Sequence, residues 1–216
     1  MSLLDVLAIL QGAVVTVSLS LAGIVLGVPL GLALALARWA RLPVIAPAVA
    51  LYVSVMRATP AVTLALLIFF ALPNAGIEMD PVPTAILTLM LNTAAFNCEI
   101  WRAALLDFSR EQLEASVSFG MGRGLRFRRI ILPQILRACL PALVNEMSLL
   151  IKASPAIAVV GIVDVTRAAV RIGAETYRPL PPLMLALVLY VVVVAALVIT
   201  QRRVERRRLE AAAAPA

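Results

Sequence analysis

Seven polar or charged side chains interrupt two stretches of the sequence that are otherwise strongly apolar. Polar side chains are costly inside a bilayer, so residues of this kind are candidates for a functional site. Asn92 and Glu99 are two helical turns apart and therefore share one face of a helix. The group either lines a polar path for a solute or forms pairs that hold helices together, and both interpretations remain open. The pairs would be Glu99 with Arg102 and Glu146 with Lys152, and the seven residues are Asn92, Asn97, Glu99, Asn145, Glu146, Lys152 and Ser154.

A second group of residues lies in a polar loop, residues 107–137, between two apolar stretches. Good helix formers extend from Arg110 to Met121, and glycines at three positions between 120 and 124 then interrupt the helical pattern. The pattern resumes over Leu125 to Ile131, just before Pro133. The loop is therefore predicted to hold two short helices, joined by a glycine-rich turn, outside the membrane.

The elements that must position these residues are membrane spans. Of the 216 residues, 62% are hydrophobic and 14% are charged, and the mean hydropathy is +1.01. These values exclude a soluble globular domain, a disordered chain and a disulfide scaffold. Five apolar segments can each hold a helix long enough to cross a bilayer. They predict an all-α integral membrane protein with about five transmembrane helices, over 6–37, 43–72, 82–106, 138–163 and 180–201.

The basic residues predict the orientation of these spans. Fourteen arginines lie in the connections on one side of a five-span chain and three on the other. Cytoplasmic loops carry the excess of Lys and Arg, so the N-terminus is expected outside and the C-terminus in the cytoplasm. This topology also explains the net charge of +7 without invoking nucleic acid.

The chain is expected to form one transmembrane domain over residues 1–216, with a core over 6–205 and a tail over 206–216. Arg57 and Pro60 predict a kink in the second apolar segment. Two distant cysteines, Cys98 and Cys139, with no His in the chain, suggest neither a metal site nor a disulfide. The glycines of the loop lack the Lys and Ser/Thr of a phosphate-binding G-x4-G-K-[ST] loop, so the chain is not expected to hydrolyse ATP.

The spacing within the loop resembles the EAA motif of ATP-binding-cassette (ABC) importer permeases, E-A-A-x3-G-x9-I-x-L-P. Only Ser116 departs from the motif, replacing the second Ala by another small residue. The segment from Tyr52 to Pro60 is similar to the Y-x4-R-x-T-P element of the polar amino acid branch. The residues that match are Glu114, Ala115, Gly120, Ile130, Leu132 and Pro133.

This resemblance implies a type I ABC importer permease in the bacterial inner membrane that transports a polar amino acid. The implied partners are a second permease, either a copy or a homologue, cytoplasmic ABC ATPase subunits and an extracytoplasmic solute-binding protein. ATP and Mg²⁺ would be held by the ATPase, so this chain is expected to bind no cofactor and no metal. The seven polar residues would then line the path of an amino acid zwitterion. The implied ATPase-coupling residues are Glu114, Ala115, Ser116, Gly120, Met121, Arg123 and Pro133.

Three other functions compete with this interpretation. A secondary transporter needs no ATPase, but such proteins usually have more spans and inverted repeats. A regulatory membrane subunit of another complex would tolerate replacement of Glu114 and Gly120. Within the favoured family, the solute could instead be an opine or another small molecule, because selectivity there lies largely in the binding protein.

Overall fold

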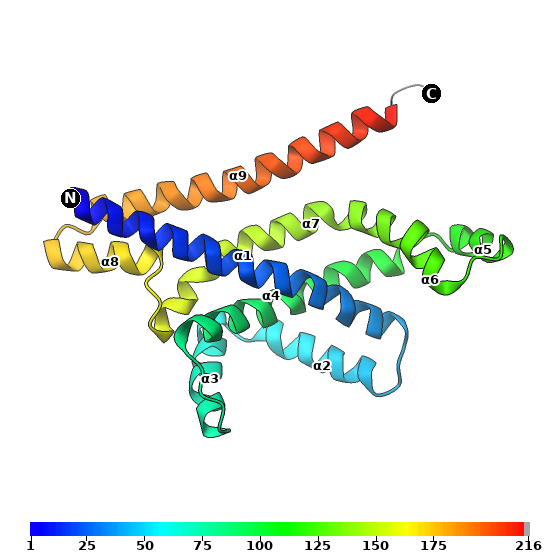
Figure 1. The fold of residues 1–216 in the computed structure, drawn as a ribbon, viewed down its shortest axis with the longest axis horizontal. Helices are drawn as coiled ribbons and strands as arrows, with labels where there is room; N and C mark the ends of the chain where they lie inside the picture. The colour runs from blue at the N-terminus through cyan, green and yellow to red at the C-terminus, as the bar shows by residue number, and fades with distance from the viewer. Residues whose placement is uncertain (214–216) are drawn as a thin grey trace.

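The fold is described by a computed structural model, in which residues 1–213 are placed, and all regular elements in this range are helical. Figure 1 shows an elongated bundle with α1 running along much of its length. The N-terminus and α8 lie at one end, and α5 and α6 lie at the other, here called the loop end. The elements are α1 (Leu3–Trp39), α2 (Ile45–Ala58), α3 (Ala61–Asn74), α4 (Pro81–Leu106), α5 (Arg110–Ser118), α6 (Arg123–Arg126), the π-helix η1 (Phe127–Ile131), α7 (Leu132–Ala153), the 3₁₀ helix η2 (Ser154–Val160), α8 (Val165–Thr176) and α9 (Leu180–Ala213).

A seam of glycines joins α1 to α4 at the centre of the bundle. Gly23, Gly27 and Gly31 recur every fourth residue, are buried and therefore lie on one face of α1. A Cβ built on Gly27 would lie 2.2 Å from Cγ2 of Thr93 on α4. Small residues at this spacing let the backbones of two membrane helices approach closely. This contact places α4, with its polar side chains, in the interior of the bundle.

The second apolar segment is broken at the predicted kink. Helices α2 and α3 are bent by 113° relative to each other. Thr59 has φ −88° and ψ 127° because the residue before a proline is pushed out of the helical region, and Pro60 has no N–H to continue the ladder. The guanidinium carbon of Arg57 lies 5.4 Å from the centroid of the Phe96 ring on α4, which anchors the bend.

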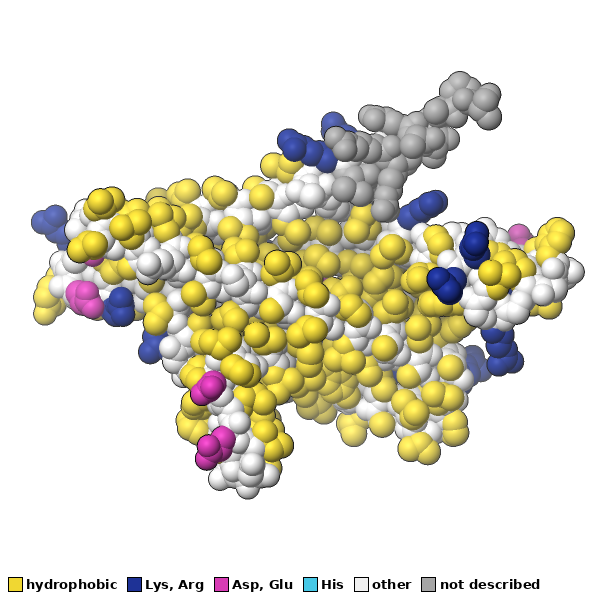
Figure 2. Space-filling view, in the orientation of Figure 1, with side chains coloured by type: hydrophobic (Ala, Val, Ile, Leu, Met, Phe, Trp, Pro, Cys, Tyr) yellow, Lys and Arg dark blue, Asp and Glu magenta, His cyan; other side chains and the backbone are white. Residues whose placement is uncertain are grey.

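The apolar surface of the chain fits a bilayer. Among the described residues, three helices are long and apolar enough to cross a membrane, or up to four if the bent pair α2–α3 is one span. Helix α4 has the length for a fifth span but carries Asn92, Asn97, Glu99 and Arg102 and is not among them. Figure 2 shows apolar side chains over the middle of the visible face, with Lys and Arg around its margins. The all-helical membrane fold is confirmed, whereas the count of five spans and their orientation remain predictions.

The second half of the polar loop differs from the prediction. Instead of a separate short helix before Pro133, helix runs on from Arg123 through η1 into α7. Proline removes one backbone donor and its ring crowds the preceding turn. The π-turn over Phe127–Ile131, immediately before Pro133, widens the helix and accommodates the ring without ending it. The predicted tail also begins as helix, since α9 continues to Ala213, and residues 214–216 lie outside the described range.

Candidate functional site

Helix α5 presents the motif residues on two different faces. Ser109 caps its N-terminus by accepting a hydrogen bond from the backbone N–H of Gln112 at 3.3 Å. Glu114 and Ala115 are exposed, whereas Ser116 is buried with 3% exposure. The Ser116 hydroxyl donates to the carbonyl of Leu113 at 2.6 Å. A serine is therefore accepted where the motif has alanine because its one polar group is satisfied locally.

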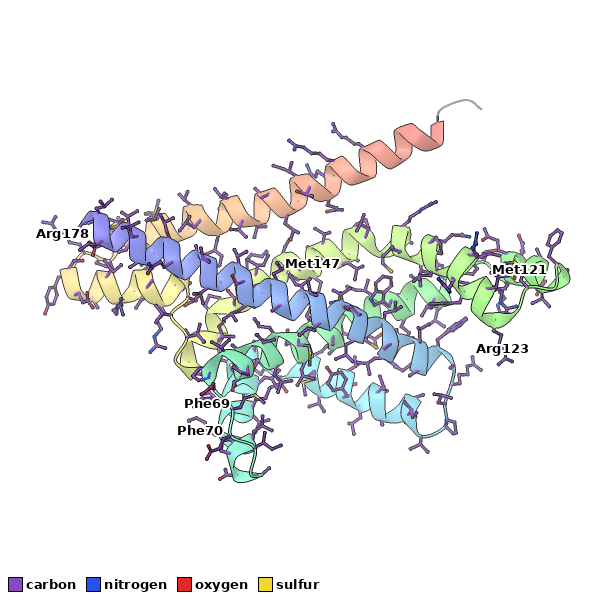
Figure 3. The ribbon with its side chains drawn as sticks, viewed as in Figure 1. Phe69, Phe70, Met121, Arg123, Met147 and Arg178 are labelled. Atoms are coloured by element: carbon purple, nitrogen blue, oxygen red, sulfur yellow. The ribbon has the colours of Figure 1, made fainter. Side chains whose placement is uncertain are left out.

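The turn after α5 depends on glycine. Gly120 has φ +72°, in the left-handed region that side chains with a Cβ seldom adopt. Its N–H donates to the carbonyl of Val117 at 2.8 Å, and the N–H of Met121 donates to the carbonyl of Ser116 at 3.1 Å. This pair of bonds is the Schellman arrangement that terminates a helix and satisfies its last carbonyls. The turn predicted at Gly120 is thus present, and Figure 3 shows Met121 and Arg123 following it at the loop end.

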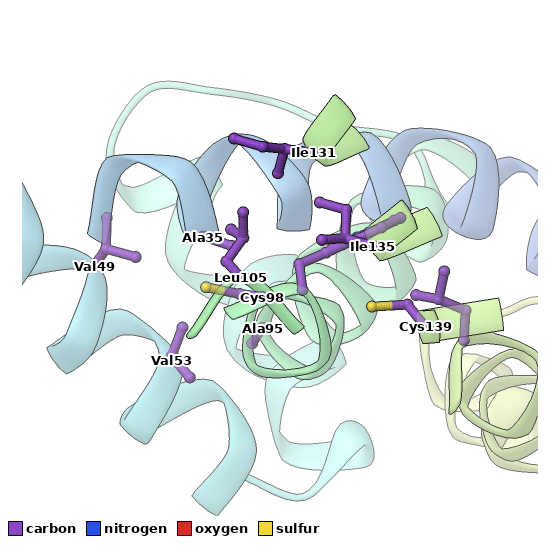
Figure 4. Close-up of a cluster of buried hydrophobic side chains, with 11 residues drawn as sticks. Ala35, Val49, Val53, Ala95, Cys98, Leu105, Ile131, Ile135 and Cys139 are labelled. Atoms are coloured by element: carbon purple, nitrogen blue, oxygen red, sulfur yellow. The ribbon is translucent and has the colours of Figure 1, made fainter. Parts of the chain in front are cut away.

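Helix α5 is attached to the membrane helices at two points. The side-chain amide of Gln134 on α7 donates to Oε1 of Gln112 at 2.8 Å. Leu113 packs against a buried cluster that includes Leu105 of α4 and Ile135 of α7. Figure 4 shows this cluster, in which side chains of α1, α2, α4 and α7 meet. Helix α5 therefore contacts both α4 and α7.

The outer face of α5 is open to a partner. Trp39, Glu114, Val117 and Arg126 line part of a shallow hollow of about 480 Å³. Phe119, at the tip of the loop, is 87% exposed. Among the side chains that the structure describes, none forms an ion pair with the Glu114 carboxylate. Exposed apolar side chains such as these, gathered beside a carboxylate at the loop end, make this face a candidate surface for contact with another protein.

The other three predicted coupling residues, Met121, Arg123 and Pro133, differ in how much they are exposed at the loop end. Arg123 is exposed, and Met121 is half-buried at the turn. Pro133 lies in the first turn of α7, where it is half-buried and positions the helix rather than the surface. The three residues therefore share the loop end, but only Arg123 is fully open to a partner.

A buried polar group links α4 to α7 in the apolar part of the bundle. The Asn97 side-chain amide donates to both the carbonyl and the hydroxyl of Thr93, each at 2.9 Å. The Thr93 hydroxyl lies 3.5 Å from Oε1 of Glu146, which is 6% exposed. The second amide atom of Asn97, Oδ1, is buried and has no partner. Thr93 is the central member of this group, and the polar-residue pattern missed it because threonine is common in apolar helices.

A second polar group ties α1 to α4 near the loop end. Glu99 accepts two hydrogen bonds from Arg102, at 2.8 and 3.0 Å, and also pairs with Arg38 of α1. The pair of Glu99 with Arg102 is therefore present, but both residues lie on α4 and the contact between helices is made by Arg38. The single negative charge of Glu99 lies between two guanidinium groups, so the group of three side chains keeps one net positive charge.

The other predicted polar residues do not join these groups. Lys152 is exposed, and no ion pair joins it to Glu146 among the residues that the structure describes, so that proposed pair is wrong. The reason is direction: Glu146 points into the bundle toward α4, whereas Lys152 lies six residues on and faces outward. Asn145 is exposed, Asn92 is half-buried, and Ser154 is buried.

Comparison with known proteins yields consistent matches. Residues 27–210 match the family model "Binding-protein-dependent transport system inner membrane component". The chain is 34% identical over 183 residues to the arginine transport system permease protein ArtQ of Bacillus subtilis, covering 84% of each chain. It is also 34% identical over 190 residues to the glutamine transport system permease protein GlnP of Escherichia coli K12, covering 85% of this chain and 84% of that protein.

Solved structures share the fold. A crystal structure of an amino acid ABC transporter with histidines superposes with a TM-score of 0.83 at 30% identity, covering 93% of this chain and 94% of the other. The MetNI methionine ABC transporter in an inward-facing conformation gives a TM-score of 0.78 at 23% identity, covering 96% and 99%, and this likeness concerns the fold alone.

Proposed function

The chain belongs to the family of binding-protein-dependent transport system inner membrane components, and we propose that its α5 surface docks a separate cytoplasmic ATPase. It is the permease of an amino acid ABC transporter, a component of the inner membrane, and the proposal assigns ATP hydrolysis to the separate ATPase. The observation that carries the docking proposal is the exposed Glu114 on a helix whose opposite face is bound to the membrane helices.

In the proposed mechanism, ATP and Mg²⁺ are held by the ATPase, and this chain converts closure of the ATPase dimer into movement of its spans. Glu114 pairs with a basic group of the ATPase, and Ala115 allows close backbone approach. Gly120 holds the loop in the turn that presents this face, with Met121 and Arg123 beside it. Because Gln112 bonds to Gln134, a push on α5 displaces the start of α7.

The proposed solute path runs beside the contact of α4 with α7. An amino acid zwitterion needs partners for both of its charges, and Glu146 and the free Oδ1 of Asn97 can receive an ammonium group. Five further residues are proposed to contact the solute at other steps or to face a second permease. They are Asn92, Glu99, Asn145, Lys152 and Ser154. The relatives named for arginine and glutamine support a polar amino acid, and an opine stays an alternative solute.

The complete transporter would contain two permeases, either two copies or this chain with a homologue, and two ATPase subunits. An extracytoplasmic solute-binding protein would deliver solute to the end that carries α8. The excess of basic residues at the loop end supports this placement, in which the N-terminus is outside and α5 is in the cytoplasm.

The test is co-purification from the native membrane followed by reconstitution. The ATPase should co-purify with the wild-type chain, and Glu114→Lys should lose solute-stimulated ATP hydrolysis while still inserting in the membrane. Glu111→Lys, which makes the same charge change on an exposed position of the same helix, is the matched control and should retain stimulation. A chain that purifies alone and transports in liposomes without an ATPase would refute the proposal, as would wild-type stimulation in Glu114→Lys.

A further inference from the structure

A second hollow at the loop end is lined by arginines from four separate segments of the chain. It encloses about 370 Å³ and is called here the arginine pocket. The guanidinium groups come from the end of α1, the turn that follows it, the end of α4 and the start of α5. Arg38 and Arg41 are three residues apart in the sequence, and the fold brings them together with Arg102 and Arg110. The four arginines are Arg38, Arg41, Arg102 and Arg110.

The pocket has positive charge to spare. Glu99 engages Arg38 and Arg102 and offsets one of their two charges. Arg41 and Arg110 are exposed, and the described part of the chain offers neither of them an ion pair. The guanidinium fork matches the geometry of phosphate oxygens and binds them with two parallel hydrogen bonds. The pocket is therefore suited to an anion with several oxygens.

The backbone at Arg41 adopts a conformation that is uncommon for a residue with a side chain. Arg41 has φ +52°, in the left-handed region, one residue beyond the C-cap of α1. Glycine is the usual residue at this position because a Cβ is unfavourable there. A positive charge near a helix C-terminus also interacts favourably with the helix dipole, but Arg38 in the last turn of α1 already provides that charge.

One wall of the pocket is apolar and partly exposed. Leu106 is 61% exposed and Trp39 is 36% exposed, and both line the pocket beside the guanidinium groups. A free phosphate ion would gain nothing from such a wall, whereas the glycerol and acyl chains of a lipid would cover it. We propose that the arginine pocket binds the phosphodiester headgroup of an anionic phospholipid, with its acyl chains against Leu106 and Trp39. Basic pockets between membrane helices bind lipid headgroups in the same way.

Lipid in this pocket would also affect α5. Trp39 and Leu113 line both the arginine pocket and the hollow beside Glu114, so the two hollows share a wall. A bound headgroup would tie the ends of α1 and α4 to the start of α5 and stiffen the path from α5 to the membrane helices. This consequence rests on the proposed docking role of α5, whereas lipid binding itself does not.

The test measures lipid binding by native mass spectrometry on the full-length chain, purified with the subunits that it retains. The probes are phosphatidylglycerol and phosphatidylcholine, with inorganic phosphate as a competitor. Arg41→Gly should lower affinity for phosphatidylglycerol about fivefold, which corresponds to about 1 kcal/mol per basic residue near an anionic surface. Adding Arg110→Gln should make the loss about 25-fold, with no change for phosphatidylcholine.

The control variants separate this site from general attraction to the surface. Arg41→Gly relieves the left-handed backbone, so it should fold at least as stably as the wild type. Arg137→Gln removes an exposed charge from the first half of α7, outside the pocket, and should keep wild-type affinity. Equal losses in Arg41→Gly and Arg137→Gln would overturn the proposal, as would displacement of the lipid by inorganic phosphate at comparable concentration. Either result would leave ATPase docking at Glu114 unaffected.

Discussion

The seam between α1 and α4 supports one prediction in which two physical effects have opposite signs. Gly27→Ala normally stabilises a helix, by about 0.5–1 kcal/mol, because alanine loses less backbone entropy than glycine. At Gly27 the new methyl group would lie 2.2 Å from Cγ2 of Thr93 and 2.9 Å from the carbonyl oxygen of Met90. Ordinary contacts between such atoms are about 3.5–4.0 Å, so α1 and α4 must separate or Thr93 must turn away.

The expected net effect is destabilisation. Overpacking a close contact costs about 1–3 kcal/mol, which exceeds the gain in helix propensity. We therefore expect Gly27→Ala to lower the free energy of unfolding by about 1–2 kcal/mol. Turning Thr93 would not avoid this cost, because its hydroxyl accepts from Asn97 and lies within reach of Glu146. Solute transport should fall with stability, since the same contact holds the polar group in place.

The measurement is unfolding of the purified chain in mixed detergent–SDS micelles, followed by circular dichroism. Gly124→Ala is the matched control, because no atom lies within 4 Å of the site of its new Cβ, and it should be neutral or stabilising. Thr93→Ser removes the methyl group in the closest contact, so Gly27→Ala should cost about 1 kcal/mol less in that background. A Gly27→Ala variant as stable as the wild type, or an equal cost in both backgrounds, would refute the reasoning.

Three further predictions concern the ends of the helices. Gly120→Ala should lower the free energy of unfolding by about 1 kcal/mol, because a Cβ is crowded at φ +72°. It should also speed hydrogen exchange in α5, and unchanged exchange would contradict the role of this turn. Gln134→Leu should reduce solute-stimulated ATP hydrolysis in proteoliposomes without loss of insertion, because it breaks the 2.8 Å hydrogen bond to Gln112. Full stimulation in this variant would show that the bond has no part in coupling. Asp164→Ala should lower the free energy of unfolding by about 1 kcal/mol and loosen the first turn of α8, because the Asp164 carboxylate accepts from the N–H of Arg167 at 2.9 Å. Equal hydrogen exchange in Asp164→Ala and Asp164→Asn would contradict this cap.

Several local features of the chain were predictable because their causes are local. Gly120 turns the chain where its neighbours leave the helix, and Thr59 is extended because a proline follows it. Ser116 stands where the motif has an alanine, and its burial and its bond to Leu113 explain why a small residue fits there. Pro133 was misleading for a related reason, since proline ends many helices but a π-turn before it lets α7 continue.

The amino-acid sequence is sufficient to predict an all-helical membrane protein, the position of its polar loop and the residues of that loop that repeat the permease motif. Hydropathy, turn residues and motif spacing are properties of short segments, so they can be obtained without knowing which helices meet. The contacts between helices are seen only in the folded chain: Glu146 faces Thr93 rather than Lys152, Gly27 brings α1 against α4, and four arginines share one pocket. These contacts join residues tens of positions apart, and their geometry depends on how the helices cross, which no single segment encodes.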